Sequence, residues 1–306
     1  MAEAHFRQGE YLYAQGQFQQ AITAYELAVN YPDSDYLAMA AYMLGWTQFK
    51  LDNHSQGIQA FGQVLDKYLG TGTVLGSGAG AGAGSSVNSI VNPSPNQLKT
   101  GEQRLVNDSI RIMSLMFSYA NNQHSLLAYI EKTGERHYHH LLFDGLAQLH
   151  LNNDRYKDSA VAYLAFAKHY PNHTQASDFY VKHIDAYILG KFPSLVLPAK
   201  QGYVEMFGVN GKTWSQQPEP IKKKLTPFLR QYLTELAQYE HARAQLLLNT
   251  PESNTQNQHI TAFTLAARWY QEYIDTFKHE KDTVEKRFLL AESLQDAGQK
   301  RASIKE

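Results

Sequence analysis

Residues 9–32 read GEYLYAQGQFQQAITAYELAVNYP, and residues 45–68 read GWTQFKLDNHSQGIQAFGQVLDKY. A shift of 36 positions superimposes the two stretches, with glycine on glycine at their starts and Tyr25 on Phe61 near their ends. A third copy, LHLNNDRYKDSAVAYLAFAKHYP, occupies residues 149–171. Because self-similarity at a fixed period of roughly 20–50 residues is typical of repeat architectures, these copies decide the fold.

Two more divergent copies lie toward the C-terminus. Residues 187–208 contain a Gly-x-Phe turn at Gly190 and Phe192, and residues 288–304 place a turn at Gly298. We therefore expect one structural unit to recur along most of the chain, with each unit packing against its neighbours.

Each copy predicts a helix, a turn and a second helix. Gly16 ends the first helix, because glycine readily adopts the left-handed conformation that a helix end needs. Tyr31 precedes proline and is therefore driven out of the α region, which stops the second helix. Small residues on one face of the second helix let the pair approach closely, and an aromatic side chain fills the groove between them. In the first copy these residues are Ala21, Ala24, Tyr25 and Ala28.

The periodicity predicts helices throughout and no convincing strand. We expect an all-α fold, an α-α superhelix (solenoid) of helical hairpins joined by short turns. The expected helices cover residues 3–15, 19–31, 36–51, 55–68, 103–120, 124–133, 138–151, 156–170, 175–189, 193–208, 219–248, 258–278 and 282–297.

The copies resemble the tetratricopeptide repeat (TPR) in their period, their Gly-x-aromatic turn, and the alanine, aromatic, alanine and proline that follow. They depart from the family where its tryptophan opens the first helix, since His5 and Ala41 stand there, and where Gln8 replaces its leucine. The resemblance implies a TPR solenoid that binds protein or peptide partners in a concave groove lined by the first helices of successive hairpins.

A narrower resemblance concerns the ends of the second helices. The segments YPDS at 31–34 and YPNH at 170–173 are similar to repeats of Gram-negative envelope proteins, including outer-membrane assembly lipoproteins, the Tol-associated coordinator and large gliding-type repeat proteins. This resemblance implies a role in envelope organisation or assembly and a periplasmic or outer-membrane-associated location. A cytoplasmic location is the alternative.

The repeats and the composition between them divide the chain into three predicted parts. Residues 1–68 form an N-terminal TPR pair, and residues 69–102 form a flexible insertion rich in Gly, Ala, Ser and Pro, which cannot bury enough apolar surface to fold alone. This insertion could be a plain surface loop or a loop that binds a partner. Residues 103–306 form a TPR-like block whose last repeat ends early, so we expect the natural protein to continue further.

Composition and motifs argue against several function classes. The 306 residues carry a formal net charge of −1 and no cysteine, so a basic nucleic-acid surface and thiol chemistry are not expected. No apolar run is long enough to span a membrane. Catalytic and nucleotide-binding motifs are missing, and His137, His140 and Asp144 offer at most a chance metal spacing. We predict no cofactor, no metal site and no enzymatic activity.

Several aromatic residues remain as candidates for partner binding. If first helices line a groove, two consecutive hairpins would bring an aromatic and charged set together there, of the composition that anchors protein interfaces. These side chains could instead pack against a neighbouring helix, and the chain could be an architectural spacer of a longer solenoid without a groove ligand. The predicted partner-binding residues are Glu10, Tyr13, Tyr42, Trp46, Phe49 and Lys50.

Overall fold

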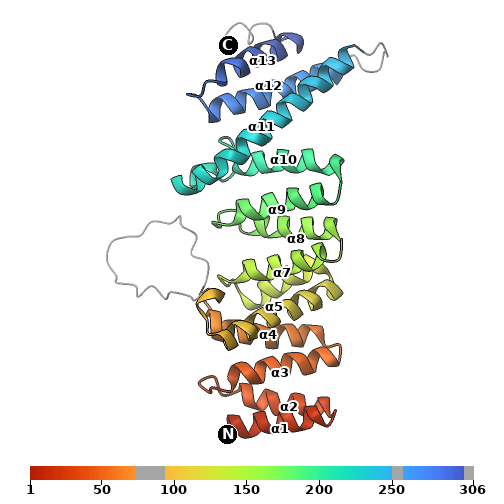
Figure 1. Ribbon diagram of the computed structural model, residues 1–306, viewed down its shortest axis with the longest axis vertical. Coiled ribbons are helices and arrows are strands. Elements are labelled where there is room, and N and C mark those ends of the chain that lie inside the picture. Colours follow the sequence, from red (N-terminus) through yellow and green to blue (C-terminus); the bar gives the residue numbers. More distant parts are fainter. Residues whose placement is uncertain (73–93, 250–257, 300–306) are drawn as a thin grey trace, which may run out of the picture. The chain divides into compact units, whose positions relative to one another are not determined.

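The structure is a computed structural model that describes residues 1–72, 94–249 and 258–299. The described residues are helical, with no strand among them, and helices follow one another in hairpins (Figure 1). This confirms the predicted all-α class of tandem helical hairpins. All thirteen expected α-helices are present, with ends within three residues of the predicted ones.

The chain divides into two compact units, Met1–Phe166 and Ala167–Glu306. The division into 1–68, 69–102 and 103–306 stays a prediction, and most of the predicted insertion and the end of the last repeat lie outside the described residues. Unit 1 contains α1 (Ala2–Ala14), α2 (Phe18–Val29), α3 (Leu37–Lys50), α4 (His54–Leu69), α5 (Thr100–Ala120), α6 (Asn122–Thr133), α7 (His139–Leu151) and most of α8 (Tyr156–His169). Unit 2 contains α9 (Ala176–Leu189), α10 (Pro193–Phe207), α11 (Glu219–Leu248), α12 (Gln258–Thr276) and α13 (Thr283–Asp296).

The same turn follows five helices of the described chain, α1, α3, α7, α9 and α13. After α1, the Gly16 amide donates to the Tyr13 carbonyl at 3.0 Å, and the Gln17 amide donates to the Leu12 carbonyl at 2.9 Å. These two bonds satisfy carbonyl groups that a helix end would otherwise leave unpaired. One residue in each turn has a positive φ, and these residues are Gly16, Asp52, Asp154, Lys191 and Gly298.

One predicted turn is displaced by a residue. The Gly-x-Phe pattern places the left-handed residue at Gly190, but Gly190 has a φ of −75° and Lys191 has a φ of +58°. The Phe192 amide then donates to the Tyr187 carbonyl at 2.9 Å, as the equivalent amide does after α1. The register is set by where α9 ends and not by the glycine, so the prediction was wrong by one position.

Glycine and an aromatic ring bring the two helices of a regular hairpin together. A Cβ at Gly9 would lie 2.5 Å from the Tyr25 ring, and a Cβ at Gly45 would lie 2.7 Å from the Phe61 ring. Tyr25 and Phe61 are both fully buried. The predicted arrangement, in which small residues permit close approach and an aromatic fills the groove, is therefore confirmed in the first two hairpins.

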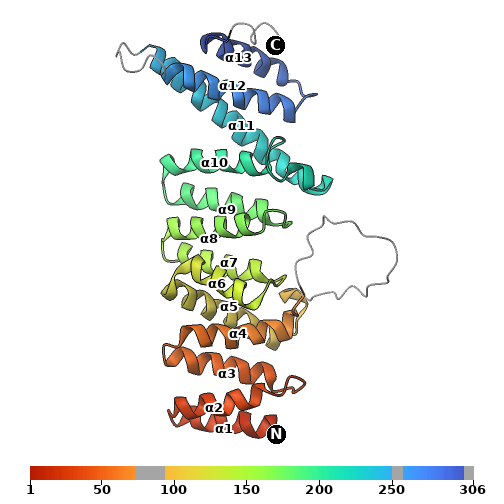
Figure 2. The same ribbon diagram turned by 180° about the vertical axis from the view of Figure 1, so that it is seen from behind.

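Helices α5, α6 and α7 depart from this rule. A Cβ at Gly145 of α7 would lie 2.7 Å from the Ser114 hydroxyl oxygen of α5, so α5 and α7 pack directly against each other. Helix α6 buries only Leu126 and Ile130. The glycine here serves contact between two first helices, and α6 lies to one side of them (Figure 2).

Unit 2 is built around the pairing of α11 with α12, to which α13 adds (Figure 1). Tyr203 of α10 and Tyr232 of α11 meet edge to face at 5.1 Å between ring centroids. The buried Lys200 ammonium pairs with Glu235 of α11, because a buried charge needs a partner. The same lysine lies over the Tyr232 ring at 5.2 Å.

Candidate functional site

Three of the predicted partner-binding residues form one aromatic cluster on α3. Tyr42, Trp46 and Phe49 follow i, i+4, i+7 spacing and so lie on one helical face. The Trp46 ring lies 6.4 Å from Tyr42 and 5.8 Å from Phe49, both edge to face. These distances fall in the range at which aromatic pairs attract each other. The sequence therefore places these three side chains correctly beside one another.

The cluster is partly committed to the hairpin's own packing. The Tyr42 and Trp46 rings contact the buried Phe61 ring of α4 at 5.8 and 6.4 Å. The Tyr42 hydroxyl donates to Asp108 of α5 at 2.6 Å, which fixes the ring. Burial, and then the carboxylate of Asp108, raise the pKa of Tyr42. All three rings of the cluster are half-buried, so each keeps an accessible edge beside its internal contacts.

The other predicted residues lie on α1 and at the end of α3. Glu10 of α1 accepts a hydrogen bond from Arg7 at 2.8 Å, and the half-buried Tyr13 ring meets Phe18 at 5.3 Å. Lys50 is exposed at the end of α3. We call the six predicted residues, from Glu10 to Lys50, the first-helix surface. Their role in partner binding stays a prediction.

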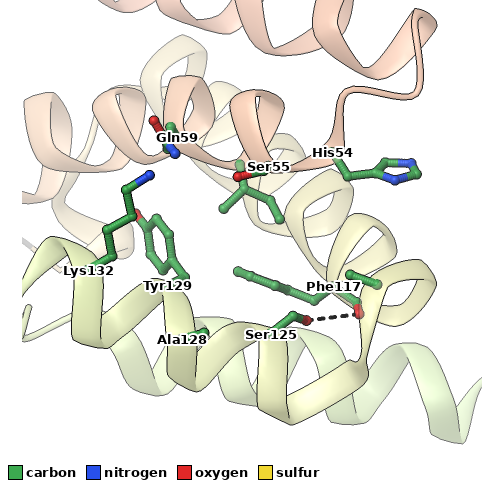
Figure 3. Close-up of a pocket in the computed structure, with 10 residues that line it drawn as sticks. His54, Ser55, Gln59, Phe117, Ser125, Ala128, Tyr129 and Lys132 are labelled. Carbon is green, nitrogen blue, oxygen red and sulfur yellow. Dashed lines mark hydrogen bonds between the residues drawn. The ribbon is translucent and has the colours of Figure 1, made fainter.

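A hollow that the sequence did not predict lies between α4 and α6. It has a volume of about 260 Å³ and a floor formed by Phe117 and Ala120 of α5. Figure 3 shows the α4 side chains along one wall, the α6 side chains along the other and Phe117 between them. We call it the α4/α6 pocket; its wall residues are His54, Ser55, Ile58 and Gln59 on α4 and Ser125, Ala128, Tyr129 and Lys132 on α6. No motif signals it, because its walls come from helices that are not consecutive in the sequence.

The histidines of the candidate metal spacing lie beside backbone carbonyl oxygens. The His137 Nδ1 atom lies 3.3 Å from the Gly72 carbonyl oxygen, and the His140 Nδ1 atom lies 2.9 Å from the His137 carbonyl oxygen. Across the described ranges, no three His, Asp or Glu side chains are grouped so that they could hold a metal ion. Nor does any helix in these ranges combine the length and apolar character that a membrane crossing requires.

Comparison with known proteins agrees with the geometry of the first hairpins. Residues 3–34 and 39–68 match the family model of the tetratricopeptide repeat. The chain carries tetratricopeptide repeats. Both matched stretches span a glycine–aromatic contact, at Gly9 and at Gly45, and TPR repeats are generally scaffolds for protein–protein interaction without catalytic activity.

The crystal structure of the TPR domain of P58(IPK) aligns with 99% of this chain and 81% of its own, at 13% identity and a TM-score of 0.23. A similarity at that TM-score supports no argument about this chain. No curated protein matches the sequence. The narrower likeness to Gram-negative envelope proteins stays a prediction.

Proposed function

We propose that this chain is a non-catalytic scaffold that captures a peptide or helix of a partner protein on the first-helix surface. The observation that carries the proposal is the α3 cluster, in which Tyr42 and Phe49 hold Trp46 by edge-to-face contacts while all three rings stay half-buried. Aromatic side chains of this kind give large contact area at low entropic cost and dominate interface energetics. An extended or helical segment is the partner that such a surface fits.

We also propose that the partner belongs to the Gram-negative cell envelope and that the protein works in the periplasm or at the outer membrane. The support is the likeness of the segments at 31–34 and 170–173 to envelope repeat proteins. Fractionation of cells that express the full-length natural protein tests this location. Recovery in the cytoplasm would favour the alternative.

The binding surface is tested by Trp46→Ala and Tyr13→Ala in pull-down experiments. Removing an interface anchor costs about 2 kcal/mol or more, which is a loss of affinity of roughly thirtyfold. Partners retained by the unmodified protein should be lost from both variants and kept by Tyr11→Ala. Tyr11 is a matched control, because it is 66% exposed on α1 and outside the predicted surface.

The architectural spacer is the second candidate, and a specific observation favours it. Tyr42 and Trp46 already contact Phe61, and Tyr42 is hydrogen-bonded to Asp108. If these rings serve packing alone, Trp46→Ala lowers the melting temperature sharply and removes no partner. Lys50→Glu separates the two functions further, because Lys50 is exposed and its change should weaken binding without lowering stability.

A further inference from the structure

We propose that the α4/α6 pocket is a second binding site, which takes one large apolar side chain of a protein segment with an acidic residue next to it. This proposal shares one premise with the proposed function, namely that the chain binds a protein. The pocket lies on α4, α5 and α6, and none of the six residues of the first-helix surface lines it. It can therefore be tested separately.

The buried part of the pocket lining is apolar. Phe117 is fully buried and Ile58 is 6% exposed, and both line the hollow. Phe117 also meets Tyr129 at 5.9 Å between ring centroids, which joins the floor to the α6 wall. An aliphatic or aromatic group that enters the hollow would bury apolar surface on three helices at once.

The size of the hollow selects a single side chain. Pockets for whole small-molecule ligands measure about 300–1,000 Å³, and this one holds about 260 Å³. Its walls extend over about two turns of α4, from His54 to Gln59, and two turns of α6, from Ser125 to Lys132. A leucine or phenylalanine side chain fits this volume, with the adjoining backbone lying along the opening.

The polar groups of the rim favour an acidic neighbour. Lys132 is exposed, and Figure 3 shows it extending toward Gln59 at one end of the opening. None of the lining residues is acidic, so a carboxylate at that end meets a cation without repulsion. The Ser125 hydroxyl is already used, because it donates to the Asn122 carbonyl at 2.7 Å. Lys132 is therefore the group that sets charge preference.

Helix α6, which forms one wall of the pocket, packs on α5 less extensively than α2 packs on α1 or α4 on α3. Gly145 brings α7 directly onto α5, and α6 contributes only Leu126 and Ile130 to the buried core. At one end of the pocket α4 and α6 meet, since a Cβ at Gly62 of α4 would lie 2.3 Å from the Tyr129 hydroxyl. The hollow is thus bounded by fixed contacts on its floor and at this end.

The test uses three dipeptide probes and methyl NMR of the whole chain. N-acetyl-Phe-Glu-amide should shift the methyl signals of Ile58, Ala120 and Ala128 in a saturable manner. N-acetyl-Phe-Lys-amide should bind roughly two- to fivefold more weakly, the size of one exposed ion pair. N-acetyl-Ala-Glu-amide lacks the large side chain and should leave these signals in place. Equal shifts from the first two probes, or shifts from none, overturn the proposal.

Two variants locate the binding. Ala128→Trp fills the opening and should abolish the shifts of Ile58, whereas Lys132→Glu keeps the hollow and should reverse the preference toward the lysine probe. Lys67→Glu is a matched control, because Lys67 is an exposed lysine of α4 outside the pocket, and it should change nothing. Retained preference in Lys132→Glu contradicts the proposal even if Ala128→Trp fails to fold.

A last variant separates this site from the first-helix surface. Lys50→Glu should leave the response to N-acetyl-Phe-Glu-amide unchanged, because Lys50 does not line the pocket. Loss of partner capture in Lys50→Glu with intact probe binding supports both proposals. If Lys50→Glu still captures partners and still binds the probe, partner binding on the first-helix surface is contradicted and the pocket keeps its support. If Lys50→Glu no longer binds the probe, the two sites are not separate.

Discussion

Helices α1–α4 and helices α5–α7 belong to the same unit but use glycine differently. In α1–α4, Gly9 and Gly45 face aromatic rings of the second helix in their own hairpin. In α5–α7, Gly145 faces Ser114 and Ile110 of α5, which is another first helix. The regular hairpins are closely packed as a result, whereas α6 packs less extensively on α5 and forms one wall of the α4/α6 pocket.

The two regions differ in which helices their glycines bring together. At Gly9, Gly45 and Gly145 the missing Cβ leaves room at a helix crossing, and a side chain of the partner helix fills that space. In α5–α7 the glycine contact joins two first helices instead, and the second helix α6 buries only Leu126 and Ile130.

The largest expected effect is the loss of an aromatic ring from a closely packed hairpin. Phe61→Ala should lower the free energy of unfolding by about 3–5 kcal/mol, because the buried ring fills the space at Gly45 and contacts Tyr42 and Trp46. Leu126→Ala in α6 should cost nearer 2 kcal/mol, the low end for such changes, because α6 can shift toward the pocket. Urea unfolding measures both. An equal cost would mean that α6 is packed as firmly as α4.

The glycines themselves give the next largest effect. Gly45→Ala and Gly145→Ala should each destabilise by about 1–3 kcal/mol through overpacking, since the new methyl group would lie within 2.7 Å of a neighbouring side chain. Gly101→Ala in α5 should instead stabilise by up to about 1 kcal/mol, because nothing lies within 4 Å of that position and alanine favours a helix. If the melting temperatures of all three variants move in the same direction, Gly45 and Gly145 do not make the close contacts described here.

Much of this could be predicted from the sequence, because the signals are local. Helix periodicity, the glycine after α1 and the pairing of Tyr25 with Phe61 across copies need only the order of residues. The α3 cluster was found for the same reason, since Tyr42, Trp46 and Phe49 share one face of one helix. The turn after α9 was missed by one residue, because Lys191 adopts a conformation that the sequence pattern assigns to Gly190.

The pocket could not be predicted in this way. Its walls come from two helices separated by more than fifty residues, and it forms only where α4, α5 and α6 pack together. The hydrogen bond from Tyr42 to Asp108 is similar, since it joins helices on either side of the long Gly-rich segment. Contacts between non-consecutive helices are set by packing and not by local pattern.

Alkaline pH should weaken the α6 region through Tyr129. Burial, and then the charge of Asp66, raise the pKa of Tyr129 to about 12, whereas an unfolded tyrosine ionises near pH 10. Between these values the unfolded chain has released a proton that the folded chain keeps, so stability falls as pH rises from about 10 to about 12. The stability of the unmodified protein should fall by about 1 kcal/mol more than that of Tyr129→Phe between pH 9 and pH 11.

Tyr11→Phe is the control for this pH effect, because Tyr11 is 66% exposed. Its stability should follow that of the unmodified protein at every pH. Urea midpoints at pH 9, 10 and 11 give the comparison. If Tyr129→Phe loses stability as steeply as the unmodified protein, the hydroxyl of Tyr129 is not protected from ionisation in the fold.

The smallest expected effects concern the shared turn, and they have opposite signs at two positions of identical geometry. Gly16 and Lys191 have φ values of +74° and +58°. A side chain in this region costs about 1–2 kcal/mol, so Gly16→Ala should destabilise by about 1 kcal/mol although nothing lies within 4 Å of Gly16. Lys191→Gly should stabilise by about 0.5–1 kcal/mol, since it removes that strain at some cost in chain entropy. Stability changes of the same sign would show that the two turns differ in the folded protein, and that the register after α9 is the one that Gly190 predicts.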